Sequence, residues 1–150
     1  ANVYPAQIAH ERDERVKRLA GKIDRVLVDA PCSGTGTLRR HPDLKWRQSP
    51  ATLAELATLQ PRVLDAAARL VKPGGRLVYA TCSPLVAEDE AVAAAFDAAH
   101  GSSFERVPAL ETLIKAQVDK PESLVEGNDL RLWTHRHGTD GFFASIWQRR

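Results

Sequence analysis

Two short segments that resemble each other constrain this chain of 150 residues more than any other feature. Each is a run of apolar and β-branched residues, at 25–30 and at 76–80, and each leads into a small turn-forming segment that carries a cysteine, Cys32 or Cys82. Such runs are typical of buried parallel strands, and ligands bind beyond the carboxyl ends of strands in open α/β sheets. If the two strands are neighbours, a strand spacing of about 4.8 Å places both thiols at one rim, roughly 5–10 Å apart.

Composition limits the class of protein. A hydrophobic fraction of 43% is sufficient for a folded core. No apolar run approaches the roughly 20 residues that a bilayer crossing needs, and the sequence shows no charged-then-apolar leader. Two cysteines are too few for a disulfide scaffold or a Cys-rich zinc site. We therefore expect a cytoplasmic protein that has neither a metal nor a membrane partner.

Hydrophobic periodicity and turn residues predict an α/β chain in which strands and helices alternate. The predicted elements, in chain order, are an edge strand at 2–8, a charged loop or helical turn at 10–18, a strand at 24–29, an irregular basic segment at 37–48, a helix from 49 to about 71, a strand at 76–80, a helix at 85–100, a strand at 104–107, a loop with a short helix at 109–117, and a final strand at 141–147.

Three local features refine these predictions. Pro61 lies inside the long helical pattern, where it is expected to kink or split the helix because it lacks an N–H. The Lys-Pro-Gly-Gly segment at 72–75 is expected to end that helix before the next strand begins. The acidic residues 88–90 are expected in the first turn of the following helix, where carboxylates interact favourably with the helix dipole.

The two cysteines allow several interpretations. A free cysteine is often a small buried apolar side chain, and a catalytic one needs a favourable environment because its pKa is near 8.5. A dithiol redox pair is possible, although Cys32 and Cys82 lack the Cys-x-x-Cys spacing. A metal site is disfavoured because no His or carboxylate cluster accompanies both thiols. The remaining interpretation is covalent catalysis on a pyrimidine, in which one thiolate adds to carbon 6, carbon 5 attacks an electrophilic methyl, and a second group assists release.

Four motifs together identify a resemblance. They are Asp-Ala-Pro-Cys-Ser-Gly-Thr-Gly at 29–36, Arg-Arg-His-Pro-Asp-Leu-Lys-Trp at 39–46, Gly-Gly-Arg-Leu-Val-Tyr-Ala-Thr-Cys-Ser at 74–83, and Asp-Gly-Phe-Phe-Ala at 140–144. The chain resembles the Nop/Sun family of RNA cytosine-5 methyltransferases, densely over residues 23–92 and again over 137–147. Among the branches of the family it is most similar to the bacterial enzymes that modify 16S ribosomal RNA.

The resemblance implies a role for individual residues. Cys82 would be the nucleophile that adds to carbon 6, and Cys32 would assist release of the methylated product. Asp29 would contact both the cofactor, S-adenosylmethionine, and the target base, although an Asp at this position could also simply cap the turn before Pro31. His10 stands where the family has an adenosine-contacting residue, usually an aspartate, and so departs from the pattern.

The resemblance also implies a fold and a domain boundary. The expected fold class is α/β, a partial Rossmann-like S-adenosylmethionine methyltransferase fold with a mostly parallel sheet, helices on both faces and an antiparallel final strand. Residues 1–150 would form the carboxyl-terminal portion of one catalytic domain, because the family's glycine-rich cofactor loop and ribose-binding acid lie upstream of the residues given. The amino-terminal half would then be a partner, and the fragment alone would bind the cofactor weakly or not at all.

The basic segment between the two cysteine motifs is expected to bind RNA, most simply ribosomal RNA. A charge run is usually just a solvated loop, but here an aromatic face that can stack on bases interleaves the cations. Its candidate RNA-binding residues are Arg39, Arg40, His41, Lys45, Trp46 and Arg47. An alternative function follows from the same segment, that of a catalytically incomplete half-domain acting as an RNA-binding or assembly module.

Overall fold

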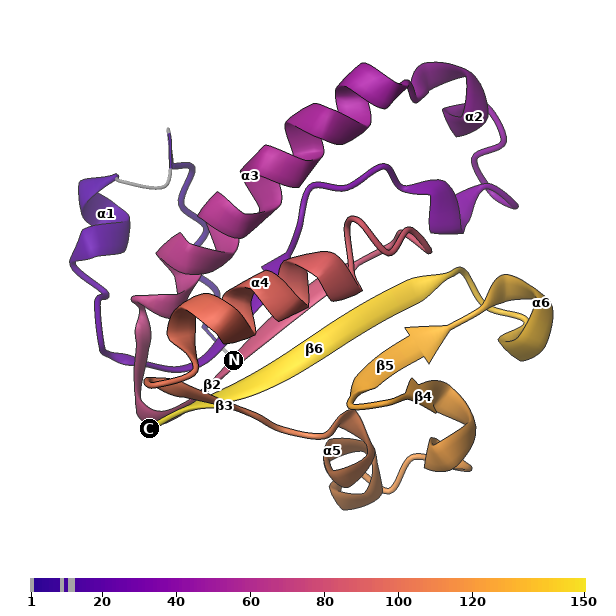
Figure 1. The fold of residues 1–150 in the computed structure, drawn as a ribbon. Helices are drawn as coiled ribbons and strands as arrows, with labels where there is room; N and C mark the ends of the chain where they lie inside the picture. The colour runs from indigo at the N-terminus through magenta and orange to yellow at the C-terminus, as the bar shows by residue number, and fades with distance from the viewer. Residues whose placement is uncertain (1, 9, 11–12) are drawn as a thin grey trace.

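The structure, a computed structural model, describes residues 2–8, 10 and 13–150 and shows one mixed sheet with helices packed on it (Figure 1). The strands are β1 (Ile23–Asp29), β2 (Val71–Thr81), β3 (Phe104–Arg106), β4 (Val125–Glu126), β5 (Asp129–Leu132) and β6 (Phe142–Arg149). The helices are α1 (Glu14–Lys17), α2 (Leu44–Arg47), α3 (Pro50–Ala68), α4 (Glu90–His100), α5 (Ala109–Lys115) and α6 (Thr134–His137), with 3₁₀ turns at Thr35–Thr37 and Pro121–Leu124.

The sheet has the order β1-β2-β6-β5-β4, and β3 pairs with the end of β6. β1 and β2 are parallel and in register from Arg25↔Arg76 to Asp29↔Ala80. The β2·β6, β3·β6, β4·β5 and β5·β6 pairs are antiparallel. The α/β class and the antiparallel final strand are confirmed. The expectation of a mostly parallel sheet is wrong for the described residues, because β6 reverses direction and the strands beyond it are joined by short connections.

Alternation along the central strands places helices on both faces. Leu77 and Tyr79 of β2 and Trp147 of β6 pack with Leu64 of α3 and Phe96 of α4 in the main core. A smaller cluster on the opposite face joins Val107, Ala109 of α5 and Ile146, with Val78 packed against it. Because successive strand side chains point to opposite faces, Leu77 and Tyr79 pack in the main core while Val78 between them packs in the smaller cluster.

The long helix α3 forms as its sequence predicts at the start and differently inside. Ser49 is the N-cap and accepts a hydrogen bond from the Thr52 main-chain N–H at 3.1 Å, with Pro50 in the first turn. Pro61 lies within the helix, which runs as one element from Pro50 to Ala68 (Figure 1). Of the two outcomes predicted at Pro61, a kink or a split, the split is therefore wrong. Packing of buried Leu64 and Ala68 against the sheet holds the helix together across the missing N–H.

Four predicted boundaries differ from the structure. Residues 2–8 form no strand, and their described side chains are exposed, because Pro5 offers no N–H to a ladder. Residues 72–75 do not separate helix from strand but lie inside β2. Ile23 pairs with Val71 and Arg25 pairs with Arg76, so β2 carries extra residues between these two pairs and the register shifts at a bulge. The helix predicted from 85 begins at Glu90. The loop predicted after the confirmed short helix contains two short strands, β4 and β5, and the short helix α6, which were missed.

Candidate active site

The two cysteines meet at one rim of the sheet. Cys32 follows β1 and Cys82 follows β2, and the Ala30 N–H donates to the Ala80 carbonyl at 2.9 Å, which keeps the strands paired to their ends. The two Sγ atoms lie 3.5 Å apart, and both residues are half-buried. The predicted proximity of the thiols is confirmed, and the sulfur atoms are closer than strand spacing alone required.

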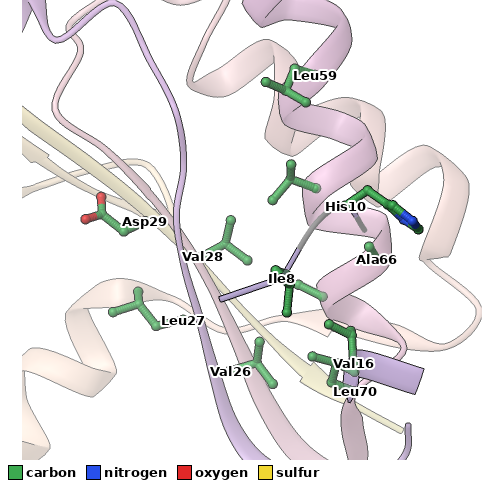
Figure 2. Close-up of a pocket in the computed structure, with 12 residues that line it drawn as sticks. Ile8, His10, Val16, Val26, Leu27, Val28, Asp29, Leu59, Ala66 and Leu70 are labelled. Atoms are coloured by element: carbon green, nitrogen blue, oxygen red, sulfur yellow. The ribbon is translucent and has the colours of Figure 1, made fainter. Parts of the chain in front are cut away.

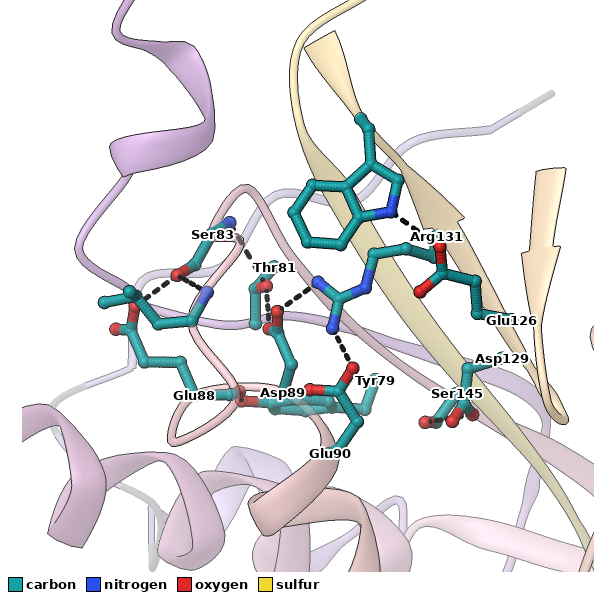
Figure 3. A network of polar contacts seen from close by, with 12 residues as sticks. Tyr79, Thr81, Ser83, Glu88, Asp89, Glu90, Glu126, Asp129, Arg131 and Ser145 are labelled. Atoms are coloured by element: carbon teal, nitrogen blue, oxygen red, sulfur yellow. Dashed lines mark hydrogen bonds and ion pairs between the residues drawn. The ribbon is translucent and has the colours of Figure 1, made fainter. Parts of the chain in front are cut away.

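A buried carboxylate connects the two cysteine loops, which we define as residues 31–34 and 82–84. Glu88 is 1% exposed, and one of its oxygens accepts from the Ser33 main-chain N–H at 2.8 Å. Its other oxygen accepts from the Ser33 hydroxyl at 2.6 Å and from the Ser83 hydroxyl. Ser33 follows Cys32 and Ser83 follows Cys82, so one side chain holds the neighbours of both thiols. Figure 3 shows the contact between Glu88 and Ser83.

The side-chain amides of two glutamines donate hydrogen bonds to the first cysteine loop. Gln60 of α3 is fully buried, and its amide donates to the Pro31 carbonyl at 2.9 Å and to Glu88 at 3.1 Å. The Gln48 amide donates to the Ser33 carbonyl at 2.7 Å. Since Pro31 and Ser33 flank Cys32, the backbone on either side of this thiol is fixed.

Close backbone contact joins the second loop to the final strand. The Gly36 N–H donates to the Cys82 carbonyl at 2.9 Å, and the Gly141 N–H donates to the Gly36 carbonyl at 2.8 Å. A Cβ on Gly36 would lie 2.4 Å from the Gly141 oxygen and 2.8 Å from the Cys82 oxygen. Glycine is therefore required where the three motif segments converge.

Burial changes the chemistry of groups at this rim. Desolvation raises the pKa of the Cys32 thiol to about 12, and the neighbouring Cys82 adds to the effect. Desolvation likewise raises the pKa of Tyr79, whose hydroxyl donates to the Glu88 carbonyl at 2.6 Å. Cys32 is therefore a protonated thiol at neutral pH.

A second network of polar side chains, centred on Asp89 and Arg131, includes Thr81, which directly precedes the second cysteine loop (Figure 3). Asp89 is fully buried, accepts from the Thr81 hydroxyl, and pairs with Arg131 of β5 at 2.6 Å. Burial raises the pKa of Asp89 to about 6, although the hydrogen bonds from Thr81 and Arg131 lower it in part. Arg131 also pairs with Glu90 and lies over the Phe143 ring, 4.7 Å from its centroid. The prediction that residues 88 and 89 belong to the first turn of a helix is wrong, because α4 starts only at Glu90.

Asp29 and His10 line the same cavity, which has a volume of about 560 Å³ (Figure 2). Its walls are mainly apolar and come from β1 and α3, and Asp29 stands at the end of β1. The remaining lining residues are Ile8, Val16, Val26, Leu27, Val28, Leu59, Val63, Ala66, Ala67 and Leu70. Apolar walls with a carboxylate at the edge fit a nucleoside that carries a cationic group.

The basic segment forms hydrogen bonds or ion pairs at both of its ends with residues near the rim that carries Cys32 and Cys82, which we call the thiol rim. Arg39 donates to Asp140 at 3.0 Å and Arg40 also pairs with Asp140, one residue before the Gly141 that contacts Gly36. At the other end Gln48 holds the first cysteine loop. Between them, Trp46 is 80% exposed with the Lys45 ammonium 4.8 Å from its ring centroid, and Arg47 pairs with Asp43. His41 is also exposed.

Sequence reasoning missed Glu88, Gln60 and Arg131. The available signal for Glu88 was the serine that follows each cysteine, since two matching serines indicate a shared acceptor. Among the described residues there is no cluster of three or more His, Cys, Asp or Glu side chains that could hold a metal ion. The helices of this described part include none with the length and hydropathy needed to cross a membrane.

Comparisons with known proteins match the chain over nearly its whole length. The family model described as 16S rRNA methyltransferase RsmB/F matches residues 2–148. A Mycobacterium tuberculosis protein, "Putative methyltransferase Rv1407", is 46% identical over 138 residues, which are 91% of this chain and 29% of that protein. The ribosomal RNA small subunit methyltransferase B of Salmonella arizonae is 50% identical over 93 residues, 62% of this chain and 20% of that protein.

Solved structures share the fold. The crystal structure of PH0851 superimposes with a TM-score of 0.73 and 38% identity, covering 85% of this chain and 27% of that one. A methyltransferase homologue from Pyrococcus horikoshii gives a TM-score of 0.65 and 27% identity, covering 91% and 42%. The chain spans less than a third of the length of the curated relatives named above. With its paired cysteine loops and this match over residues 2–148, the chain belongs to the RsmB/F family of 16S rRNA methyltransferases.

Proposed function

We propose that a protein carrying this chain transfers a methyl group to carbon 5 of a cytosine in RNA, with 16S ribosomal RNA as the substrate that the family indicates. The observation that supports this most is the pair of sulfur atoms 3.5 Å apart at the carboxyl rim of β1 and β2. A pyrimidine unstacked from its helix and set against this rim meets both thiols at once.

The two thiols divide the chemistry between them. Cys82 acts as the nucleophile, and its thiolate forms a bond to carbon 6, which makes carbon 5 electron-rich. S-adenosylmethionine, when bound, supplies the methyl group that carbon 5 attacks. A water molecule then takes the carbon-5 proton as base, and the electron pair of that C–H bond re-forms the ring double bond as the bond between sulfur and carbon 6 breaks. This restores the aromatic ring and releases Cys82 as its thiolate. Cys32, whose pKa is raised to about 12 by burial, stays protonated and assists this release rather than adding to the base.

Asp29 and His10 are proposed to contact the cofactor. Both line the apolar cavity beside β1, and Asp29 lies three residues before Cys32, so it connects the cavity with the thiol rim. The exposed Trp46 and its basic neighbours are proposed to contact the RNA beside the same rim, with Trp46 stacking on a base and the cations meeting phosphates.

The rest of the catalytic domain is proposed to complete the cofactor pocket against β1. Leu27 is 67% exposed on β1, and within the described residues the outer edge of this strand carries no partner strand. An isolated chain of residues 1–150 should therefore bind S-adenosylmethionine weakly or not at all. Calorimetry that gave a low-micromolar affinity for the isolated chain would contradict this part of the proposal.

A covalent trapping assay tests the reaction. In a protein that carries this chain together with the rest of the catalytic domain, Cys32→Ala should accumulate a covalent protein–RNA adduct, because addition proceeds and release fails. Cys82→Ala should form no adduct. The wild type should methylate the RNA and accumulate little adduct. An adduct that persists in Cys82→Ala, or RNA that carries no 5-methylcytosine after reaction with the wild type, would refute the proposal.

A further inference from the structure

We infer that Glu88 is a positioning residue that sets the separation of the two thiols. Its catalytic meaning rests on the function proposed above, while its geometric basis does not. Cys32 and Cys82 are 50 residues apart in the chain, and parallel strands fix only the ends of their backbones. The turns that follow must be held separately, and the Glu88 carboxylate contacts both of them.

The side-chain contacts of Glu88 reach both cysteine loops. One oxygen accepts from the Ser33 N–H and the Gln60 amide, and the other accepts from the hydroxyls of Ser33 and Ser83. The Ser33 and Ser83 hydroxyl oxygens lie 3.3 Å from each other, so the two loops meet at this carboxylate. The Tyr79 hydroxyl and the Glu88 carbonyl fix the backbone that presents the side chain.

Removal of the carboxylate would take from the Ser33 main-chain N–H and the Ser83 hydroxyl the acceptor that each has in a fully buried place. The Gln60 amide would keep the Pro31 carbonyl, and the Ser33 hydroxyl would keep the Thr35 hydroxyl. Ser33, Ser83 and Gln60 are each 1% exposed or less, so water does not readily replace the lost oxygens. Unpaired buried donors are rare in folded proteins because their desolvation is uncompensated. The two loops would therefore shift to find other partners, and the sulfur atoms attached to them would move apart.

The rate of intramolecular disulfide closure measures thiol separation without reference to methylation. Oxidised glutathione first forms a mixed disulfide with one cysteine, and the other thiol then displaces glutathione, so that two protein thiols and one oxidised glutathione become one protein disulfide and two reduced glutathiones. In Glu88→Ala the closure step should slow by about tenfold or more, because intramolecular reactions are steeply sensitive to small misplacements. The closure rate of Glu88→Gln should lie between those of the wild type and of Glu88→Ala, because the glutamine amide keeps one acceptor oxygen and the serine hydroxyls can reorient.

Asp129→Ala is the matched control. Asp129 is a carboxylate that is partly buried, and its partners, Arg106 and Ser145, belong to β3 and β6 rather than to the cysteine loops. Closure in this variant should stay within about twofold of the wild type. If Glu88→Ala does not fold, as judged by its thermal transition, Ser83→Ala serves in its place. It removes the contact of Glu88 with the second cysteine loop, together with the contacts of the Ser83 hydroxyl with Ser33 and the Leu85 N–H, and should still slow closure. Unchanged closure in a folded Glu88→Ala, or in Ser83→Ala where that variant replaces it, would overturn the inference.

A kinetic readout separates positioning from folding in the longer protein. Glu88→Ala should lower kcat for RNA methylation with the KM for RNA nearly unchanged, and Glu88→Gln should recover part of the loss. A rise in KM alone would contradict a positioning role. Absence of methylation in the wild type would refute the proposed function but leave the closure result intact, so the two failures are distinguishable.

Discussion

At the scale of single residues, the fold changes the chemistry of the Cys32 thiol strongly. Burial at the end of β1 raises its pKa to about 12. A thiol that stays protonated is a poor nucleophile but can donate its proton to a neighbouring group. Cys32 is therefore better suited to assist release than to add to the base.

Alkylation rates test this effect of burial on Cys32. In a Cys82→Ala chain, the part of the rise in the Cys32 pKa that Cys82 causes is absent, and the larger part that burial causes remains. Labelling of Cys32 by iodoacetamide at pH 8 should therefore be slower than in the denatured chain, because only the thiolate reacts. The same variant in denaturant serves as the control and should label with an ordinary thiol midpoint. A native midpoint below pH 9 would contradict the effect of burial.

Gly36 provides a second test at this scale. Gly36→Ala should lower the free energy of unfolding by roughly 2–4 kcal/mol, because its Cβ would press on two backbone oxygens, those of Gly141 and Cys82. Gly127→Ala is the control, since Gly127 has a φ of +61° but open space around its Cβ, and should cost about 1 kcal/mol. Urea denaturation of both variants measures the difference. Equal losses in the free energy of unfolding would contradict a destabilising effect of a Cβ at this close backbone contact.

At the scale of elements, α3 connects the site with the core. Its buried face carries Leu64 and Ala68 into the main cluster and presents Gln60 to the first cysteine loop. Its start is fixed by Ser49, directly after the Gln48 that also holds this loop. Shifts in α3 would therefore reach Cys32 through two separate amides.

The N-cap of α3 is expected to contribute measurably to stability. Ser49→Ala should lower the free energy of unfolding by about 1 kcal/mol, because the Thr52 N–H loses its acceptor. Thr58→Ala, in which a hydroxyl bonded to the Glu55 carbonyl within the helix is removed, should change stability by no more than about 0.5 kcal/mol. Urea denaturation compares the two variants, and a smaller loss for Ser49→Ala than for Thr58→Ala would contradict the capping role.

At the scale of the whole molecule, ion pairs join segments that lie far apart in the chain. Arg131 of β5 pairs with the fully buried Asp89 and with the partly exposed Glu90 at the start of α4, and Arg106 of β3 pairs with both Asp97 and Asp129. The Arg131–Asp89 pair connects the antiparallel part of the sheet with the segment that follows Cys82. Titration of a buried member should therefore affect the stability of the whole fold.

Asp89 predicts a specific dependence on pH. Its pKa is raised from 3.8 to about 6 in the folded chain, so the folded state binds this proton more tightly than the unfolded state. Its contribution to stability is thus fully present below pH 4 and is lost as the pH rises through 6. The free energy of unfolding of the wild type relative to Asp89→Asn should accordingly fall between pH 4 and pH 7. Urea denaturation across this range measures it, and a difference that rises with pH would contradict the sign.

The sequence predicted those parts of the fold that depend on local pattern. The strands that lead to Cys32 and Cys82, the capped start of α3 and the short helix α5 follow from apolar runs and capping residues. The strand β5 was missed because it is only four residues long and contains a buried arginine, which hydropathy treats as a surface residue. Residues 2–8 were overpredicted because their alternation finds no strand to pair with among the described residues.

The sequence by itself determined that two thiols would lie at one end of a sheet, because parallel strands that each end in a cysteine turn must bring those turns to the same rim. Only the tertiary structure decided how close the sulfur atoms lie and that burial raises the pKa of Cys32. It also decided that Glu88 joins the two loops, since its contact to Ser33 spans 55 residues. The serine after each cysteine indicates a shared acceptor, but which residue supplies it depends on how elements pack against each other.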